Sequence, residues 1–305
     1  WRASEPWILK NRAVSDVYEY GSVQKPITIA IALESGAIDE DYECIDRTGS
    51  LDLYKATKYS DLKGRYIYTW DKRADGKLDI SGIFRDSNNP CTAQVALRTN
   101  FADFYSKLKD FGIGQFIGIG LQEETTSYLR PYEQWTKLDL ITASFGQGIS
   151  ATSLQVISAL STLANDGKRM RPYIISEITD NKETIKIEPK VLSQPISEKT
   201  AHFVTKALQE AVQEGLLGGL VSADLKKYDI AAKTGTAQIA KSGSAGYAKY
   251  ITNATTVGYA PTNSPKLILL VKLEEPEISE FATYTSNLVW RDIFLAIVND
   301  MEIQK

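Results

Sequence analysis

The sequence has few of the residues on which many enzyme sites and structural sites depend. Its 305 residues include two cysteines and one histidine. Cys44 and Cys91 define no disulfide framework, and whether they pair stays open. These few residues also give no metal-ligand spacing, so neither a metal nor another cofactor is expected. His202 lies in an amphipathic helical pattern, which favours a surface or packing role over a place in a Ser-His-Asp triad.

A strong charge of one sign and long apolar runs are also missing. The 35 basic and 38 acidic residues give a net charge of −3, which predicts no nucleic-acid partner. No stretch approaches the roughly 18 apolar residues of a membrane-spanning helix. The chain opens at Trp1 without a signal peptide. That start resembles a cut end, so we expect a membrane anchor or further domains to precede it in the parent protein.

Apolar periodicity and turn residues predict an α+β fold. Helices are predicted over 26–35, 90–112, 138–144, 153–167, 198–214 and 285–300. The second of these runs from Pro90 to Gly112, and the fourth ends at Gly167 and is capped by Ser150 or Thr152. Strands are predicted over 228–240, 251–260 and 267–273, with a further strand at 7–9 joining their sheet. Residues 37–85 are polar and predicted to be irregular. The pattern indicates a helical middle and an antiparallel sheet built largely from the last third.

The scarcity of histidine directs attention to lysine as a catalytic base. The pattern Ser-x-x-Lys occurs at Ser22, Ser60 and Ser106. Ser22 stands directly before the apolar run of a buried helix, with Lys25 about one turn of roughly 5.4 Å further along. Ser60 lies in a polar, turn-rich stretch with no buried helix behind it. Alone, the pattern is weak, and its meaning depends on partner motifs.

Two further motifs supply such partners. Ser-x-Asn occurs once, at 87–89, in a turn before the Pro90 helix. Lys-Thr-Gly occurs once, at 233–235, within a predicted strand and followed by Thr236. A near match at 241–243 falls in a Gly/Ser-rich loop, where it suits a turn better than a site. Ser106 follows Ser-x-Asn in the chain, so it does not fit the order of the three motifs.

The order Ser22-x-x-Lys25, Ser87-x-Asn89, Lys233-Thr-Gly resembles the active-site set of penicillin-binding proteins and serine β-lactamases. Longer segments are similar to the class B penicillin-binding proteins, the monofunctional transpeptidases. These segments are 11–28 around Ser22, 144–168, and 231–238 followed by Gly258-Tyr259-Ala260-Pro261. The resemblance extends over nearly the whole chain.

The sequence departs from that family pattern at a few positions. Tyr20 stands where the family usually has proline, and Val23-Gln24 replaces a small hydroxyl residue followed by phenylalanine. Asn88 stands where aspartate is found in the second motif of related enzymes. Gln24 is expected to change the packing beside Ser22 in a way that the sequence does not define.

The resemblance implies a β-lactamase/transpeptidase-like fold, with an antiparallel sheet flanked by helices and an all-helical subdomain. The α/β subdomain is expected over about 1–36 and 205–305. The mostly helical subdomain is expected over about 37–204. An N-terminal anchor and a pedestal domain are expected to lie outside this chain.

Ser22 is the expected nucleophile. Serine reacts only when a neighbour takes its proton, and lysine can do so only when neutral. Burial, a second cation such as Lys233 and the positive end of a helix all disfavour the ammonium form. We therefore hypothesise that Lys25 has a lowered pKa and acts as general base. The alternative is that Lys25 only orients Ser22, and the proton passes through Ser87.

The resemblance assigns the remaining site residues to the substrate. Ser87 relays a proton to the leaving amine and Asn89 positions the peptide's amide, although both suit plain helix capping as well. Lys233, with Thr234 and Thr236, holds a terminal carboxylate, and Gly235 lets the backbone of an extended peptide approach. The backbone N–H groups of Ser22 and Thr236 form the oxyanion hole.

The implied activity is that of a serine D,D-transpeptidase, which cross-links peptidoglycan stem peptides and is acylated by β-lactams. Alternatives are a serine β-lactamase, a β-lactam sensor, a D,D-carboxypeptidase or a non-catalytic scaffold of cell-wall synthesis. Implied partners are stem peptides, β-lactams, a glycosyltransferase and other division or elongation proteins. The implied location is the outer face of the cytoplasmic membrane. The sequence does not decide between division and elongation.

Overall fold

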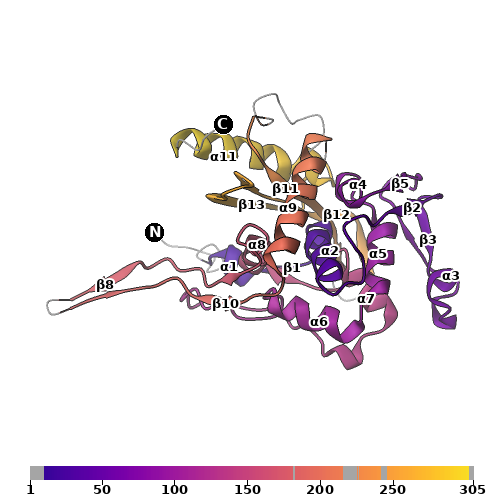
Figure 1. Cartoon of the computed structure of the whole chain (residues 1–305), viewed down its shortest axis with the longest axis horizontal. Coiled ribbons are helices and arrows are strands. Elements are labelled where there is room, and N and C mark those ends of the chain that lie inside the picture. Colours follow the sequence, from indigo (N-terminus) through magenta and orange to yellow (C-terminus); the bar gives the residue numbers. More distant parts are fainter. Residues whose placement is uncertain (1–9, 181–182, 216–224, 226, 242–245, 302–305) are drawn as a thin grey trace.

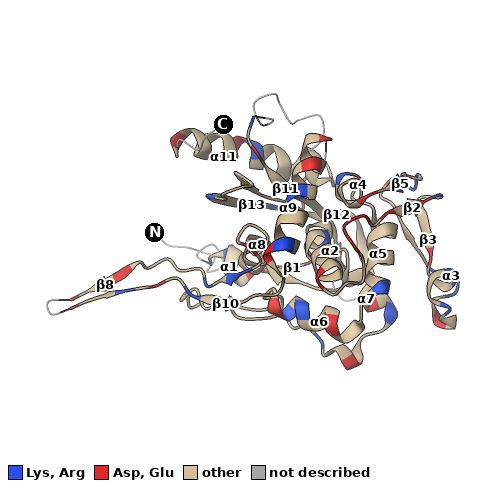
Figure 2. Cartoon of the chain, in the orientation of Figure 1, with Lys and Arg blue, Asp and Glu red and all other residues tan. Residues whose placement is uncertain are grey.

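The computed structural model describes residues 10–180, 183–215, 225, 227–241 and 246–301 (Figure 1). The strand predicted at 7–9 lies outside these residues. No described helix is long and apolar enough to cross a membrane. Basic and acidic residues are interspersed along the elements, as the colours of Figure 2 show, in keeping with the nearly balanced charge of the sequence.

The central sheet is the predicted antiparallel meander. It consists of β11 (Ala231–Ala240), β12 (Tyr247–Ala260) and β13 (Leu267–Glu274), in the order β11-β12-β13. The β11 strand begins three residues after its predicted start, and β12 begins four residues earlier than predicted. β11 is therefore an edge strand of this sheet, with Lys233 paired to Val257 and Thr236 paired to Ala254.

Helices cover both faces of this sheet (Figure 1). On one face lies α11 (Ser286–Asp300), where Trp290 packs so closely on Gly258 that a Cβ there would lie 2.9 Å from the indole. On the other face lie α9 (Glu198–Gln213) and α2 (Lys25–Glu34). Thr205 of α9 and Tyr259 of β12 share a buried hydrogen bond of 2.7 Å.

The α2 helix is apolar nearly all round and is buried, as its sequence predicts. It is preceded by a 3₁₀ turn, η2 (Gly21–Gln24), so the regular helix starts at Lys25 rather than residue 26. Its C-terminus is closed by Gly36, which has a left-handed φ of +67°.

The predicted helix from Pro90 to Gly112 is wrong as one piece. It is two helices, α5 (Asn89–Arg98) and α6 (Phe101–Asp110), because the Asn100 side chain accepts from Ala102 N and Asp103 N and starts a new helix. Neighbouring helices are α4 (Ile80–Arg85) and α7 (Lys137–Ala143).

The helix predicted from 153 to Gly167 is shorter than expected. It is α8 (Ser153–Ser161), and turns carry the chain on to Gly167. Of the two predicted caps, Thr152 is the one used, in a capping box with Gln155.

The prediction of an irregular 37–85 segment is also wrong, because short hairpins organise it. β2 (Cys44–Asp46) pairs with β5 (Gly76–Leu78), and β3 (Ser50–Asp52) pairs with β4 (Tyr66–Tyr68). A short helix, α3 (Leu53–Thr57), follows β3. The Cys44–Cys91 disulfide joins β2 to α5 and settles the pairing that the sequence left open.

The remaining described elements are small. They are α1 (Arg12–Ser15), the pair β1 (Val17–Tyr18) and β6 (Ala151–Thr152), the pair β7 (Arg169–Met170) and β10 (Val191–Ser193), the pair β8 (Glu177–Thr179) and β9 (Thr184–Lys186), and 3₁₀ turns at Ser60–Leu62, Tyr132–Gln134 and η6 (Ala282–Tyr284). The β8–β9 hairpin projects from the body (Figure 1). The segment predicted to be mostly helical thus also contains many short strands.

Candidate active site

The turn that carries Ser22 is packed against a loop that follows α7. Gly21 has a left-handed φ of +58°, and its N–H donates to Gly146 O at 3.1 Å. Gly146 is also left-handed, and a Cβ there would lie 2.1 Å from Gly21 O. Only glycine fits at this approach, so the Gly146 backbone fixes where the Ser22 turn begins.

The same turn packs against β11 on its other side. A Cβ on Gly235 would lie 2.5 Å from Tyr20 O, and a Cβ on Gly21 would lie 2.9 Å from Thr236 O. The Lys-Thr-Gly strand and the nucleophile turn therefore meet backbone to backbone. The prediction for Gly235 concerned the approach of a substrate backbone, whereas the close approach in the structure is made by the protein's own nucleophile turn.

Two N–H groups face this contact. In a strand, the C=O and N–H of one residue point to the same edge, and Thr236 O points to Gly21. Thr236 N–H therefore points to the free edge of β11, beside the Ser22 turn. The N–H of Ser22 belongs to the first turn of η2, where N–H groups have no intrahelical acceptor. The oxyanion hole formed by these two N–H groups stays a prediction.

Lys25 is fully buried and points toward Ser87. Its Nζ donates to Ser87 Oγ at 3.1 Å and also to Ser87 O. Within the described part of the chain, Ser22 Oγ has no hydrogen-bond partner, so the expected direct Ser22–Lys25 bond is not made in this structure. In the 3₁₀ turn, positions three apart eclipse, so the two side chains still project from one side.

Ser87 is the point where the three motifs meet. Its Oγ lies 3.1 Å from Lys25 Nζ and 3.0 Å from Lys233 Nζ. Lys233 Nζ also donates to Thr234 O at 3.0 Å. Ser87 has a left-handed φ of +52°, which a non-glycine residue adopts at a cost and which aims its hydroxyl between the two lysines.

Both lysines have lowered pKa values. Burial, followed by the positive charge of Lys233, holds the pKa of Lys25 well below its ordinary value, while Asp75 opposes the shift. Burial lowers the pKa of Lys233 to about 7. The lowered pKa of Lys25 favours its neutral amine, which is the form that a lysine base requires.

Asn88, the middle residue of the second motif, holds the Ser87 loop in place. It is fully buried, and its Oδ1 accepts from Cys91 N at 2.7 Å. Its Nδ2 donates to Asp46 at 2.9 Å and Asp75 at 2.8 Å. Asn88, rather than Ser87 or Asn89, is therefore the helix cap. Sequence reasoning missed Asp46 and Asp75, which carry no local motif and lie far from Asn88 in the chain.

The predicted substrate-binding side chains line both sides of the site. Asn89, the first residue of α5, donates from Nδ2 to Tyr68 O at 3.3 Å. Thr236 Oγ1 accepts from Ala282 N at 3.0 Å. Thr234 and Thr236 are two residues apart on β11, so their hydroxyls share one face of the strand, as binding one carboxylate requires.

Two of the residues that depart from the family pattern, Tyr20 and Gln24, belong to one buried chain of hydrogen bonds. Tyr20 OH donates to Gln24 Oε1 at 2.8 Å, and Gln24 Nε2 donates to Thr28 Oγ1 at 3.3 Å. Thr28 Oγ1 donates in turn to Ser144 O at 2.7 Å. This series of hydrogen bonds links the nucleophile turn to the end of α7. It defines the packing of Gln24, which the sequence left undefined.

The other candidate residues lie outside this assembly. Ser60 and Ser106 are exposed, in a 3₁₀ turn and on α6. Positions 242 and 243 of the near match lie outside the described residues. His202 is exposed and lies 3.0 Å from Asp166, which confirms its predicted surface place.

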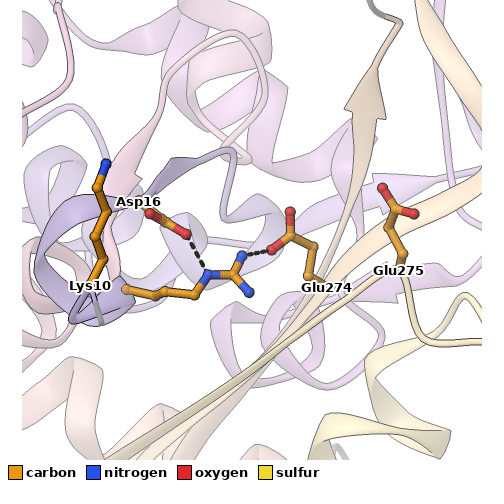
Figure 3. Close-up of a pocket in the computed structure, with 5 residues that line it drawn as sticks. Lys10, Asp16, Glu274 and Glu275 are labelled. Atoms are coloured by element: carbon orange, nitrogen blue, oxygen red, sulfur yellow. Dashed lines mark hydrogen bonds and ion pairs between the residues drawn. The ribbon is translucent and has the colours of Figure 1, made fainter. Parts of the chain in front are cut away.

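A separate concavity of about 480 Å³ is lined by Lys10, Arg12, Asp16, Glu274 and Glu275 (Figure 3). Arg12 pairs with Asp16 at 2.5 Å and with Glu274. These side chains are largely exposed, and exposed ion pairs of this kind contribute little to stability. None of the three motifs contributes to the lining of this pocket.

Comparison with known proteins identifies the family. Residues 3–298 match the family described as penicillin binding protein transpeptidase domain. The chain belongs to this family, and the resemblance inferred from its motifs is confirmed.

Named relatives agree with that assignment. Stage V sporulation protein D of Bacillus subtilis is 32% identical over 274 residues, which cover 88% of this chain and 40% of the relative. The probable peptidoglycan D,D-transpeptidase PenA of Neisseria flavescens is 28% identical, over 88% of this chain and 60% of that protein. The chain thus spans 40% to 60% of the length of these two relatives.

A solved structure shows the same fold. Penicillin binding protein 3 of Mycobacterium tuberculosis, complexed with aztreonam, has a TM-score of 0.83 and 25% identity, over 97% of this chain and 65% of that one. The predicted α+β transpeptidase-like fold is confirmed.

Proposed function

We propose that this chain is a serine D,D-transpeptidase domain that cross-links peptidoglycan stem peptides through an ester on Ser22. One observation carries the proposal: Ser87 Oγ lies within hydrogen-bonding distance of both Lys25 and Lys233, beside the turn that presents Ser22. A serine relay between two buried lysines suits proton transfer in acyl transfer and has no evident structural purpose.

In the acylation step, Ser22 Oγ attacks the penultimate D-Ala carbonyl of the donor peptide. Neutral Lys25 takes the proton of the Ser22 hydroxyl. The N–H groups of Ser22 and Thr236 stabilise the oxyanion of the tetrahedral intermediate. The C–N bond to the terminal D-Ala then breaks, and its nitrogen receives a proton through Ser87. Because Ser87 Oγ accepts from both lysines, its own hydrogen remains available to the leaving nitrogen.

In the second step, an amine of a neighbouring stem peptide attacks the Ser22 ester. A new amide bond forms, the C–O bond to Ser22 breaks, and the amine's proton returns to the serine through the same lysine-serine pair. During the first step, before D-Ala leaves, Lys233, Thr234 and Thr236 hold the donor's terminal carboxylate, and Asn89 positions its amide. A β-lactam is attacked in the same way but keeps its leaving nitrogen tethered, so the Ser22 ester persists.

The parent protein is proposed to work at the outer face of the cytoplasmic membrane, anchored by a helix outside this chain, where its peptidoglycan substrate lies. Its proposed partners are a glycosyltransferase and other proteins of division or elongation. The two-subdomain boundaries, about 1–36 with 205–305 and about 37–204, remain a prediction.

The test is intact mass after incubation with benzylpenicillin, followed over hours. The expected result is a stable adduct that maps to Ser22 and is absent from Ser22→Ala. Ser106→Ala is the matched control, because it removes the serine of another Ser-x-x-Lys and should leave the adduct unchanged. Rapid loss of the adduct with drug consumption would indicate a β-lactamase, and no adduct would support a scaffold.

A peptide ending in D-Ala-D-Ala, supplied with and without an amine acceptor, separates the two remaining activities. A transpeptidase forms the amide product when the acceptor is present. A carboxypeptidase releases D-Ala and the free acid in both cases.

A further inference from the structure

Three metal-ligating side chains of two chemical types meet at the surface where α9 begins. Glu198 and His202 are four residues apart on α9, so they share one face of the helix. Asp166 reaches the same place from the turn that follows α8. One imidazole nitrogen and one carboxylate oxygen of each acid lie within 4.8 Å of one another. None of the three active-site motifs contributes to this cluster.

The spacing of these atoms is close to that of a ligand shell around a metal ion. Zinc–nitrogen and zinc–oxygen bonds of about 2.0–2.2 Å place neighbouring ligand atoms roughly 3–3.5 Å apart. His202 Nε2 and Asp166 Oδ1 already lie 3.0 Å apart. Glu198 is exposed, so a change of its rotamer can bring a carboxylate oxygen to the same distance without moving the backbone.

Backbone and side-chain contacts hold together the two segments that carry the ligands. A Cβ on Gly167, the residue after Asp166, would lie 2.2 Å from Ile196 O, just before α9. Further along α9, Thr205 Oγ1 donates to Leu163 O at 3.2 Å in a buried bond. The ligands therefore project from elements that are fixed relative to one another, as a preorganised metal site requires.

The negative charge of the cluster lacks a basic partner other than the imidazole. Among the described residues, Asp166 pairs only with His202, and Glu198 has no ion pair. The adjacent lysine, Lys199, pairs with Glu40 instead. Two carboxylates this close repel each other, and a divalent cation between them removes the repulsion. A nitrogen ligand beside the oxygens favours Zn²⁺ over Mg²⁺ and Ca²⁺, which prefer oxygen ligands alone.

We propose that Asp166, Glu198 and His202 bind one Zn²⁺ ion, which clips the turn after α8 to the start of α9. Water would fill the remaining coordination positions. The sequence led us to expect no metal because that expectation considered histidine and cysteine spacing and took no account of carboxylates. This inference does not rest on the proposed acyl transfer at Ser22.

The experiment follows the imidazole proton signals of His202 by NMR while ZnCl₂ is added to protein that carries no polyhistidine tag. His202 is the only histidine of the chain, so its signals are identified without ambiguity. We expect a saturable change at one equivalent of zinc and no change with MgCl₂ at the same concentration. Zinc at about 100 times its Kd should also raise Tm by about 3–5 °C.

Variants measured by isothermal titration calorimetry test the three ligands separately. Asp166→Asn, Glu198→Gln and His202→Ala should each weaken zinc binding at least tenfold, because loss of a group that only orients a metal ligand already costs about 10- to 100-fold. Glu210→Gln is the matched control. It removes a carboxylate from the same helix, where Glu210 pairs with Lys206, and should leave zinc affinity unchanged.

A lone surface histidine would also respond to zinc, but its affinity would not depend on the two acids. Unchanged affinity in Asp166→Asn and Glu198→Gln would therefore overturn the site. It would equally be overturned by His202 signals that do not respond to zinc, or that respond to magnesium as strongly. Loss of affinity in all three ligand variants, with Glu210→Gln unaffected, would support it.

Discussion

The nucleophile turn (residues 20–24) and the Ser87 loop (residues 86–89) lie on either side of the same chemistry, but different contacts hold them. The nucleophile turn is fixed by backbone packing at Gly21, Gly146 and Gly235. The Ser87 loop is fixed by a buried asparagine, two carboxylates and a nearby disulfide. The nucleophile turn should therefore be sensitive to side-chain volume added at its glycines. The Ser87 loop should be sensitive to the loss of its hydrogen bonds, to reduction of the disulfide and to pH.

The largest effect is expected at the nucleophile turn. Gly146→Ala places a Cβ within 2.1 Å of Gly21 O, at a left-handed φ. We expect a loss of about 4 kcal/mol or more in the free energy of unfolding, measured by denaturant titration. Gly36→Ala is the matched control. It has a similar φ but open space, so it should cost only about 1–2 kcal/mol. Equal losses would show that backbone strain, rather than the close approach, is the cause.

The next effect tests the covalent support of the Ser87 loop. Reduction of the Cys44–Cys91 disulfide, which closes a separation of 47 residues, should lower the free energy of unfolding by about 3 kcal/mol. Thermal unfolding with and without a thiol reductant measures the loss. The Cys44→Ser/Cys91→Ser double variant should show a similar loss and no response to reductant. A reductant effect that persists in that variant would have another origin.

Asn88→Ala tests the polar support of the same loop. The change removes a helix cap and leaves Asp46 and Asp75 without their shared donor, so we expect a loss of about 2–3 kcal/mol. Acylation of Ser22 should slow as well, because the Ser87 loop loses its anchor. Asn100→Ala removes an exposed cap without buried partners and should cost only about 1 kcal/mol, with unchanged acylation.

The smallest effect is a pH dependence that the two lysines share. The lowered pKa of Lys25 makes its base form available as pH rises, so acylation should increase with pH on the acid side. Lys233 has a pKa of about 7 and loses its charge above that value. Acylation by a ligand with a carboxylate should therefore fall by about tenfold per pH unit on the alkaline side. In Lys233→Arg, which stays charged, the alkaline fall should disappear; an unchanged profile would assign it to another group.

The sequence predicted the residues of the site better than their contacts. Motif order alone grouped Ser22, Lys25, Ser87 and Lys233, and the structure places Lys25 and Lys233 within hydrogen-bonding distance of Ser87. The catalytic roles of these residues stay a prediction. The motifs did not reveal that Lys25 bonds Ser87 instead of Ser22. The hydrogen bond from Lys25 to Ser87 depends on the left-handed backbone of Ser87. Asn88, which bonds the carboxylates of Asp46 and Asp75, supports that backbone.

The fold was predictable where periodicity was strong and local. The sheet, α2, α9 and α11 follow their patterns closely. The break at Asn100 had a local signal, an asparagine three residues before Asp103, but the continuing apolar pattern obscured it. The hairpins within 37–85 are too short for periodicity to show, and the meeting of Asp166 with Glu198 and His202 depends on packing between two separate segments.

The edge position of β11 has a consequence for self-association. An unpaired strand edge is a surface on which a second chain can add a strand and begin to aggregate. Here the nucleophile turn backs onto the edge at Thr236, and a Cβ on Gly21 would already collide with its carbonyl. The nucleophile turn thus covers part of this edge and shortens the row of backbone groups that is open to a second strand.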